Sequence, residues 1–179
     1  MDRVPKKYFL TKGSGTGQTP LLSFEAALKD ADIAAYNLVK VSSIIPPNCQ
    51  EINIKKGKKY LSRGEIVYTV LSEHITNQSA KSISCALGIA RPLDNSLHGY
   101  VYEHSDEDKP EETIGKFAEQ CAISMVANAS GLNIQNIERV HNNKDIQKIL
   151  SQSKYISIEE QANTDTNFLT VIAALIFIL

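Results

Sequence analysis

The last twelve residues are the feature that most limits what this chain can fold into. From Phe168 to Leu179 they read Phe-Leu-Thr-Val-Ile-Ala-Ala-Leu-Ile-Phe-Ile-Leu, and Thr170 is the one polar residue. A helix needs about 20 apolar residues to cross a bilayer, so we expect no membrane span here. The run instead predicts a β-strand that is buried on both faces and covered by other parts of the fold.

Two amphipathic helices and several further strands are predicted. Thr19-Pro20 is a typical helix start, a capping residue followed by proline, and this helix should end near Ala31. The second helix carries an apolar stripe at helical spacing and stops at Gly131; the stripe consists of Ile114, Phe117, Ala118, Cys121 and Met125. The predicted strands are 7–11, 35–42, 65–71, 82–90, 97–103, 155–158 and 168–177. Because strands and helices do not alternate regularly, the pattern favours an α+β fold in layers.

A glycine-rich stretch lies between the first strand and the first helix. Gly13, Gly15 and Gly17 alternate with other residues in Lys12–Gln18. The spacing does not match the G-x-G-x-x-G fingerprint, and the G-K-[ST] ending of a phosphate-binding loop is missing. We therefore expect a flexible loop here and no phosphate site.

Composition excludes several classes of function. Nineteen basic and twenty acidic residues give a formal charge of -1, which argues against nucleic acid as a partner. The lysine-rich stretch 53–59 is expected to be a solvated loop. The three cysteines have neither metal-site spacing nor an even count, so we expect no metal and a reducing, cytoplasmic environment; they are Cys49, Cys85 and Cys121. The length of 179 residues favours a single domain over 1–179.

A pair of adjacent serines stands at an unusual place in the chain. Ser42 and Ser43 end a short run of alternating apolar residues, and Ile44-Ile45-Pro46-Pro47 follows at once. A strand cannot continue through two prolines, because proline has no N–H group and forces the preceding residue into extended geometry. We therefore expect the serines at an abrupt strand end, where special chemistry tends to occur.

This serine pair can support cleavage of the chain without a second enzyme. The hydroxyl of Ser43 can attack the carbonyl carbon of Ser42, and the resulting oxyanion needs hydrogen-bond donors. Collapse gives an ester, and elimination from Ser43 leaves dehydroalanine, which hydrolyses to a pyruvoyl group and ammonia. Strand alternation puts Asn37 on the same side as Ser43, so its amide is either an oxyanion donor or a group that satisfies a turn.

Glu103 is the candidate proton donor for the reaction that a pyruvoyl group would catalyse. Such a group forms a Schiff base with an amine and withdraws electrons, so that carbon dioxide can leave. The carbanion then takes a proton from an acid that stays neutral near pH 7. Glu103 ends the strand 97–103 on the face of Val101, an apolar setting that favours the neutral carboxyl. The alternative is an exposed carboxylate at a strand end.

Several motifs follow one known family in order and spacing. They are Gly17-x-Thr19-Pro20-Leu21, Phe24-Glu25-x-Ala27-Leu28, the run from Asn37 to Pro47, and the strand end Tyr102-Glu103. On these motifs the chain resembles the pyruvoyl-dependent arginine decarboxylases. The serine pair alone would not be specific, but the motifs together are.

The resemblance implies a four-layer αββα sandwich that cleaves itself into a β chain, residues 1–42, and an α chain, residues 43–179. It implies that Ser43 becomes a covalent pyruvoyl cofactor, that Asn37 assists processing and that Glu103 donates the proton. It also implies trimers or pairs of trimers with active sites between protomers. The implied reaction converts arginine to agmatine and carbon dioxide.

The same resemblance indicates how the substrate would be recognised. Glu25 stands where the family has an aspartate that binds the guanidinium group, and it keeps the charge while adding a methylene. A carboxylate can hold a guanidinium through two parallel hydrogen bonds, so arginine fits. Leu21 is expected in the same substrate site.

Two other functions stay open at this point. The chain could be a pyruvoyl-dependent decarboxylase of another cationic amino acid, such as histidine. It could also be a relative that folds, assembles and binds amines without cleaving itself. Substrate profiling separates the first alternative, and the mass of the purified chain separates the second.

Overall fold

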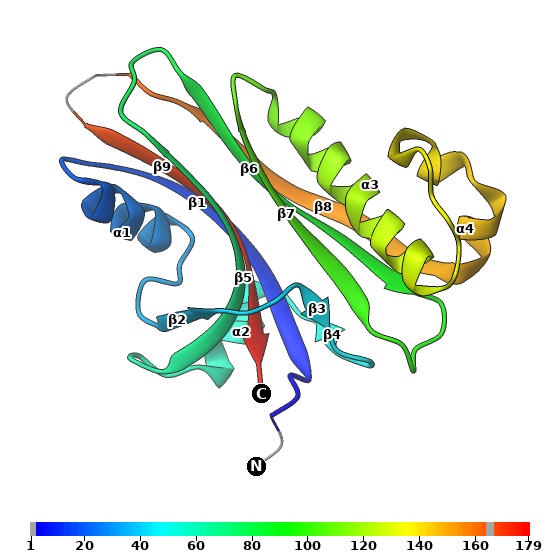
Figure 1. The fold of residues 1–179 in the computed structure, drawn as a ribbon. Coiled ribbons are helices and arrows are strands. Elements are labelled where there is room, and N and C mark those ends of the chain that lie inside the picture. The colour runs from blue at the N-terminus through cyan, green and yellow to red at the C-terminus, as the bar shows by residue number, and fades with distance from the viewer. Residues whose placement is uncertain (1–2, 164–166) are drawn as a thin grey trace.

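The molecule is built in layers, with two β-sheets face to face and one long helix on the outer side of each sheet (Figure 1). The computed structural model describes residues 3–163 and 167–179. The order of the layers is helix, sheet, sheet, helix. This α+β arrangement agrees with the layered α+β fold predicted from the sequence pattern and is consistent with the sandwich that the family resemblance implied.

The first sheet, sheet A, has five strands in the order β2-β5-β9-β1-β4. The strands are β1 (Lys7–Gly17), β2 (Asn37–Lys40), β4 (Gln50–Glu51), β5 (Ile66–Thr76) and β9 (Phe168–Ile178). The central strand β9 pairs antiparallel with both β1 and β5. Residues 169–178 of this strand are all buried, which confirms the predicted strand covered on both faces.

The second sheet, sheet B, has four strands in the order β3-β7-β6-β8. They are β3 (Ile44–Ile45), β6 (Ser82–Pro92), β7 (Gly99–Glu107) and β8 (Leu150–Gln161). The main core lies between the two sheets, where apolar residues of alternate positions meet, among them Tyr8, Val70, Leu87, Ile89, Val171 and Leu175. Burial of this apolar surface is the main force that holds the two sheets together.

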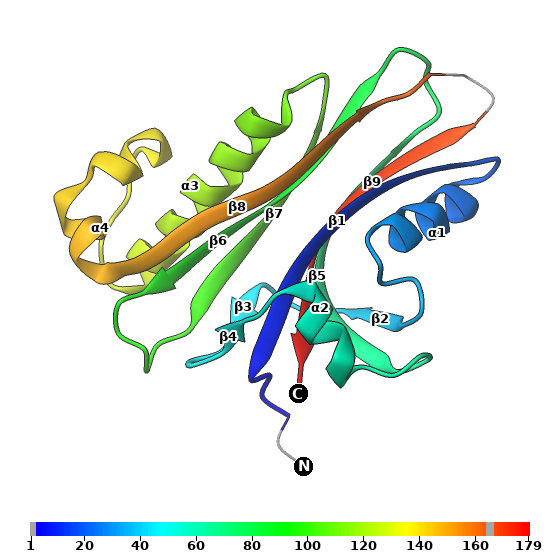
Figure 2. The same ribbon diagram turned by 180° about the vertical axis from the view of Figure 1, so that it is seen from behind.

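The two long helices form where the sequence predicted them. Helix α1 (Pro20–Asp30) is capped by Thr19, whose side chain accepts a hydrogen bond from the Leu22 amide at 3.2 Å. Helix α3 (Glu111–Ala129) is followed by Gly131, which has a φ of 82°. Helix α1 packs on the outer face of sheet A and α3 on the outer face of sheet B (Figures 1 and 2).

The prediction of a flexible glycine-rich loop was wrong, because β1 continues through this stretch to Gly17. Its three glycines lie on the strand face that α1 covers. A Cβ atom at Gly15 would stand 2.3 Å from the Ala27 nitrogen, and one at Gly13 would stand 2.5 Å from the Ala27 oxygen. The glycines are therefore there so that the backbones of helix and strand can approach closely.

Several elements are longer or more regular than predicted. Strand β7 runs to Glu107, beyond the predicted end at residue 103, because it pairs with β6 over that length. The expected basic loop contains helix α2 (Ile54–Gly57) and the 3-10 helix η1 (Lys58–Tyr60). The 3-10 helix η2 (Ile137–Asn142) and helix α4 (Lys144–Ile149) precede β8. Among the residues described, no helix is both long and apolar enough to cross a membrane.

One stretch of chain passes from sheet to sheet and positions the candidate site. Strand β2 is an edge of sheet A and β3 is an edge of sheet B, so residues 41–43 cross between the sheets. The chain then runs across the end of the sandwich to β4, at the opposite edge of sheet A (Figure 2). The two adjacent serines lie within the first crossing.

Candidate active site

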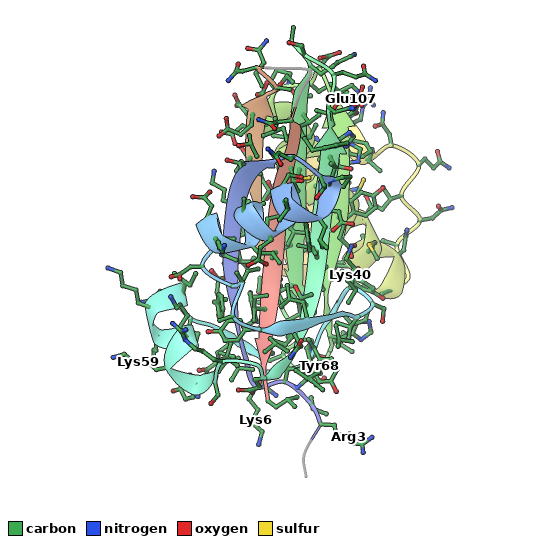
Figure 3. The ribbon with its side chains drawn as sticks, turned by 90° about the vertical axis from the view of Figure 1, so that its left-hand side faces the viewer. Arg3, Lys6, Lys40, Lys59, Tyr68 and Glu107 are labelled. Atoms are coloured by element: carbon green, nitrogen blue, oxygen red, sulfur yellow. The ribbon has the colours of Figure 1, made fainter. Side chains whose placement is uncertain are left out.

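The bond between Ser42 and Ser43 joins a residue held by one sheet to a residue held by the other. The amide of Val41 donates to the Thr69 carbonyl of β5 at 3.0 Å, which ties the chain to sheet A just before the serine pair. The carbonyl of Ser43 accepts from the Val101 amide of β7 at 2.9 Å. The strand predicted over 35–42 is therefore shorter. It ends before the serines at Lys40, which is labelled in Figure 3.

The side chain of Ser43 points at the carboxyl group of Glu103. Its Oγ donates a hydrogen bond to Glu103 Oε2 at 2.7 Å, the usual length for such a bond. Ser43 is half-buried and Glu103 is exposed. The structure thus brings together two residues that lie 60 positions apart and that the sequence had named for two successive steps.

The carbonyl of Ser42 already has a hydrogen-bond donor. The amide of Ile44 donates to the Ser42 oxygen at 2.9 Å, which closes a three-residue turn around Ser43. This oxygen is the atom on which charge would develop if Ser43 attacked the Ser42 carbonyl carbon. Sequence reasoning missed this donor, because a backbone N–H group has no residue-type signature.

Asn37 lies at the other end of β2 from the serines. Its Nδ2 donates to the Gly64 carbonyl at 2.7 Å, and the residue stands opposite Ile66 of β5. Leu38 packs into the cluster beneath α1, so Asn37 faces the opposite side of sheet A, toward sheet B. Within this chain its side chain bonds the Gly64 carbonyl rather than the serine pair.

Glu25 and Leu21 lie on helix α1, across sheet A from Glu103. The Glu25 carboxylate is 3.8 Å from the ammonium group of Lys29 one turn along the helix. Leu21 is 74% exposed. Because β7 belongs to sheet B and α1 covers the outer face of sheet A (Figure 1), a single chain does not bring these side chains to Ser43.

The apolar setting expected for Glu103 is not found in the single chain. Val101 on the same face of β7 is buried, but Glu103 is exposed. The reason is the short strand β3, which pairs only with Gly99 and Tyr100 and leaves this edge of β7 uncovered farther along. Any apolar cover for Glu103 must therefore come from outside the described chain.

The neighbours of Glu103 on the other face of β7 are held by helix α3. The ring of His104 lies 4.8 Å from that of Phe117, and the ring of Tyr102 lies 6.2 Å from it. Burial lowers the pKa of His104 and raises the pKa of Tyr102. These two titratable groups are turned toward α3, so Glu103 is the β7 side chain that meets Ser43.

A hollow of about 320 Å³ adjoins the serine pair. Its lining is mainly apolar and comes from several parts of the chain: Arg3, Val4, Pro5, Val41, Ser42, Ile44, Pro46, Tyr68 and Phe177. The described residues form no cluster of histidine, cysteine or carboxylate side chains that could hold a metal ion.

Comparison with known proteins places this geometry in a family. A family model described as pyruvoyl-dependent arginine decarboxylase matches residues 7–179. The chain is 43% identical over 129 residues to the pyruvoyl-dependent arginine decarboxylase of Methanococcoides burtonii, with 72% of each chain covered. It is 38% identical over 181 residues to a probable pyruvoyl-dependent arginine decarboxylase of Chloroherpeton thalassium, with 99% of this chain and 100% of that relative covered.

A further relative supports the same assignment over almost the whole length. Pyruvoyl-dependent arginine decarboxylase 2 of Methanosarcina acetivorans is 35% identical over 178 residues, which are 98% of this chain and 97% of the relative. The matched region includes the serine pair and Glu103, whose side chains the fold brings into contact. The chain therefore belongs to the pyruvoyl-dependent arginine decarboxylase family.

Proposed function

We propose that this chain decarboxylates arginine to agmatine and carbon dioxide with a pyruvoyl group made from its own Ser43. The observation that carries the proposal is the 2.7 Å hydrogen bond from Ser43 Oγ to Glu103 Oε2, at the crossing between two sheets. The family assignment supports both the covalent pyruvoyl group and arginine as the substrate. Catalysis by this group requires that the chain first cleave itself between Ser42 and Ser43.

The groups around the serine pair fit this cleavage. The Glu103 carboxylate accepts the hydroxyl hydrogen of Ser43, which orients Oγ and makes it a better nucleophile. The amide of Ile44 points at the Ser42 oxygen and can stabilise the oxyanion that forms there. Formation of the ester moves the acyl carbon of Ser42 from nitrogen to Oγ. Elimination of the Ser42 carboxylate, followed by hydrolysis, then yields residues 1–42, a pyruvoyl-blocked chain 43–179 and ammonia.

Glu103 has a second task after cleavage. A pyruvoyl carbonyl captures the amine of the substrate and withdraws electrons from its α-carbon. Because Glu103 already contacts the side chain of residue 43, it stands where a proton must be delivered once carbon dioxide has left. We propose that its carboxyl group is the proton donor.

Recognition of the substrate calls for more than one protomer. We propose that Glu25 and Leu21 bind the substrate and that Asn37 assists processing, at a site completed by a neighbouring copy in a trimer or hexamer. The support is an exposed apolar surface on β2 and β5, where Val39 stands opposite Tyr68 and both side chains are exposed. Such a surface is typical of an interface between proteins. A second copy at this place would also supply the apolar cover that Glu103 lacks.

The proposal is tested by the mass of the purified protein and by its products. We expect fragments of residues 1–42 and 43–179, with the larger one lacking a free N-terminal amine. We also expect agmatine and carbon dioxide from arginine, and loss of activity after borohydride reduction in the presence of substrate. A free serine amine on the larger fragment would indicate ordinary proteolysis and would contradict the proposal.

The two alternative functions give different outcomes in the same experiment. A blocked, cleaved protein that prefers histidine or lysine to arginine would be a decarboxylase of another cationic amino acid. A chain that stays intact at 179 residues would be a relative that does not process itself. The carboxylate at Glu25 favours a cationic side chain in the substrate, so uncharged amino acids should be turned over poorly.

A further inference from the structure

We infer that Arg91 is a positioning residue that fixes the new end of the chain after self-cleavage and so sets where the group made from Ser43 stands. The inference rests on the proposed function. It concerns residues 43–51, which become the first nine residues of the α chain and are called the leading segment below. Arg91 lies outside this segment, near the end of β6.

Cleavage changes how the leading segment is held. In the intact chain Ser43 is tethered from both sides, but in the cleaved protein one covalent tether is gone. Near the free end the backbone hydrogen bonds are the one from the Val101 amide to the Ser43 carbonyl and those that pair β3 with β7, and Ile45 is buried in the core. Strand β3 has two residues, shorter than ordinary strands, so contacts farther along the segment become important for the position of its end.

Arg91 supplies such a contact. Its Nη1 donates a hydrogen bond to the Cys49 carbonyl at 2.5 Å. Hydrogen bonds from a charged donor are shorter and stronger than neutral ones. Cys49 is fully buried, and burial raises the pKa of its thiol to about 11 while the positive charge of Arg91 acts in the opposite direction. Both observations place the guanidinium group directly beside Cys49.

Gly99 of β7 leaves room for the Arg91 side chain. A Cβ atom at Gly99 would stand 3.3 Å from Arg91 Cγ and 2.8 Å from the Ala90 oxygen. Gly99 is also the residue that pairs with Ile45 of the leading segment. The aliphatic part of the Arg91 side chain therefore lies close to the β3–β7 pair near the free end. Its guanidinium group reaches Cys49, the last residue of the turn that follows β3.

A rigid turn connects these two places. In Pro46-Pro47-Asn48-Cys49 the Cys49 amide donates to the Pro46 carbonyl at 3.2 Å, and Asn48 has a φ of 59°. Proline at the second position and a left-handed residue at the third are the signature of a type II turn. The proline rings also fix two backbone angles. Holding the Cys49 carbonyl therefore limits where Ile45 and the free end before it can lie.

The far end of the leading segment is held by contacts other than the hydrogen bond from Arg91. The Tyr8 hydroxyl donates to Glu51 Oε2 at 3.1 Å, and Lys154 forms an ion pair with the same carboxylate. Strand β4 also pairs with β1. A substitution at Arg91 should therefore loosen the turn and the free end while the rest of the segment stays anchored.

The test replaces Arg91 by methionine, which keeps an unbranched apolar stem and removes the donor. We expect Arg91→Met to cleave and to carry a full complement of pyruvoyl groups, counted by borohydride trapping and mass. Its kcat per pyruvoyl group should fall about ten- to hundredfold, because a misplacement of about 1 Å costs that much. KM for arginine should change far less, and Arg91→Lys should recover part of the kcat.

Lys12→Met is the matched control. Lys12 Nζ donates to the Ser157 carbonyl at 2.7 Å, so this basic side chain also joins sheet A to a backbone carbonyl of sheet B. It lies away from the leading segment. We expect its loss to lower the Tm while the kcat per pyruvoyl group keeps its parental value.

The outcomes separate the inference from the proposed function. Parental kcat per pyruvoyl group in Arg91→Met overturns the inference, and so does an equal loss in Lys12→Met, which would indicate general loosening. If Arg91→Met does not fold, Arg91→Lys decides: the inference then requires faster amide exchange at 44–49 together with a lower kcat, and fails without both. A parent chain that stays intact or makes no agmatine contradicts the proposed function instead.

Discussion

The two sides of the Ser42–Ser43 bond are built very differently. On the upstream side, β2 is an edge strand in which three of four residues are exposed. On the downstream side, Ile45 and Cys49 are fully buried and the turn between them is held by Arg91. On the upstream side Val41 packs, partly buried, against the core between the sheets, whereas Ile45 and Cys49 on the downstream side are members of that core.

This difference would allow the proposed cleavage to occur without the chain coming apart. Each side already belongs to a different sheet before the bond breaks, because Val41 bonds β5 and Ser43 bonds β7. The proposed cleavage would therefore remove a covalent link between two anchored pieces and expose little of the core. The upstream side could adjust around the new carboxylate of Ser42, while the downstream side would keep residue 43 beside Glu103.

The largest expected effect comes from removing the nucleophile at the junction of the two sides. Ser43→Ala has no hydroxyl to attack Ser42, so the chain should stay intact and should make no agmatine. The backbone bonds that hold Val41 and the Ser43 carbonyl do not involve this hydroxyl, and the one bond lost is to the exposed Glu103, so the Tm should stay near that of the parent. Intact mass and circular dichroism measure both properties, and cleavage of this variant at the same bond would remove Ser43 from the mechanism.

The next effect concerns the carboxyl group that faces the junction. Glu103→Gln keeps an oxygen that can accept the Ser43 hydrogen bond, so folding should persist and cleavage should still occur. The amide cannot deliver a proton, and turnover per pyruvoyl group should fall by about 10²–10⁴-fold. The turnover is measured as agmatine formation by a cleaved sample whose pyruvoyl groups are counted by borohydride trapping. Parental turnover in that sample would return Glu103 to the role of an exposed carboxylate at a strand edge.

A pair of apolar truncations tests the contrast between the sides directly. Ile45→Ala on the buried side should cost about 2–5 kcal/mol of unfolding free energy, because it leaves a cavity in the core. Val39→Ala on the exposed side loses, within a single protomer, only a cross-strand contact with Tyr68 and should cost below about 1 kcal/mol when the protomers are dissociated. Both are best measured by urea unfolding in the uncleaved Ser43→Ala background, where a single chain can refold. Equal costs would mean that the two sides are anchored alike.

Much of the fold was predictable because its signals are local. The capping pair Thr19-Pro20, the stripe of the second helix and the apolar run ending the chain each follow from neighbouring residues, and each element was found. The glycine-rich stretch was misjudged because its cause is distant in sequence. Its glycines serve the approach of α1 to β1, and composition alone could not distinguish that packing from a flexible loop.

The candidate site likewise contains residues that the sequence could indicate and groups that it could not. Ser43 and Glu103 could be named from motifs, and the structure then brought their side chains together. The Ile44 amide could not be named, since every residue but proline has one and only its direction matters. Arg91 gave no signal either, because its contact is with a backbone carbonyl 42 positions away. The exposure of Glu103 follows from the shortness of β3, which the motif did not indicate.

The smallest expected effect concerns the ion pair on the upstream side. Lys40 Nζ lies 3.2 Å from Glu73 Oε1, and the two side chains are 54% and 38% exposed. A pair with this exposure contributes about 0–1 kcal/mol, because water and salt screen the charges and ordering both side chains costs entropy. Lys40→Met in the Ser43→Ala background should therefore shift the unfolding free energy by no more than that, and the shift should shrink at about 1 M salt. A double-mutant cycle with Glu73→Gln isolates the pair. A coupling well above 1 kcal/mol that survives high salt would show that the upstream side is anchored more firmly than its exposure indicates, and the contrast between the two sides would then rest on the core around Ile45 alone.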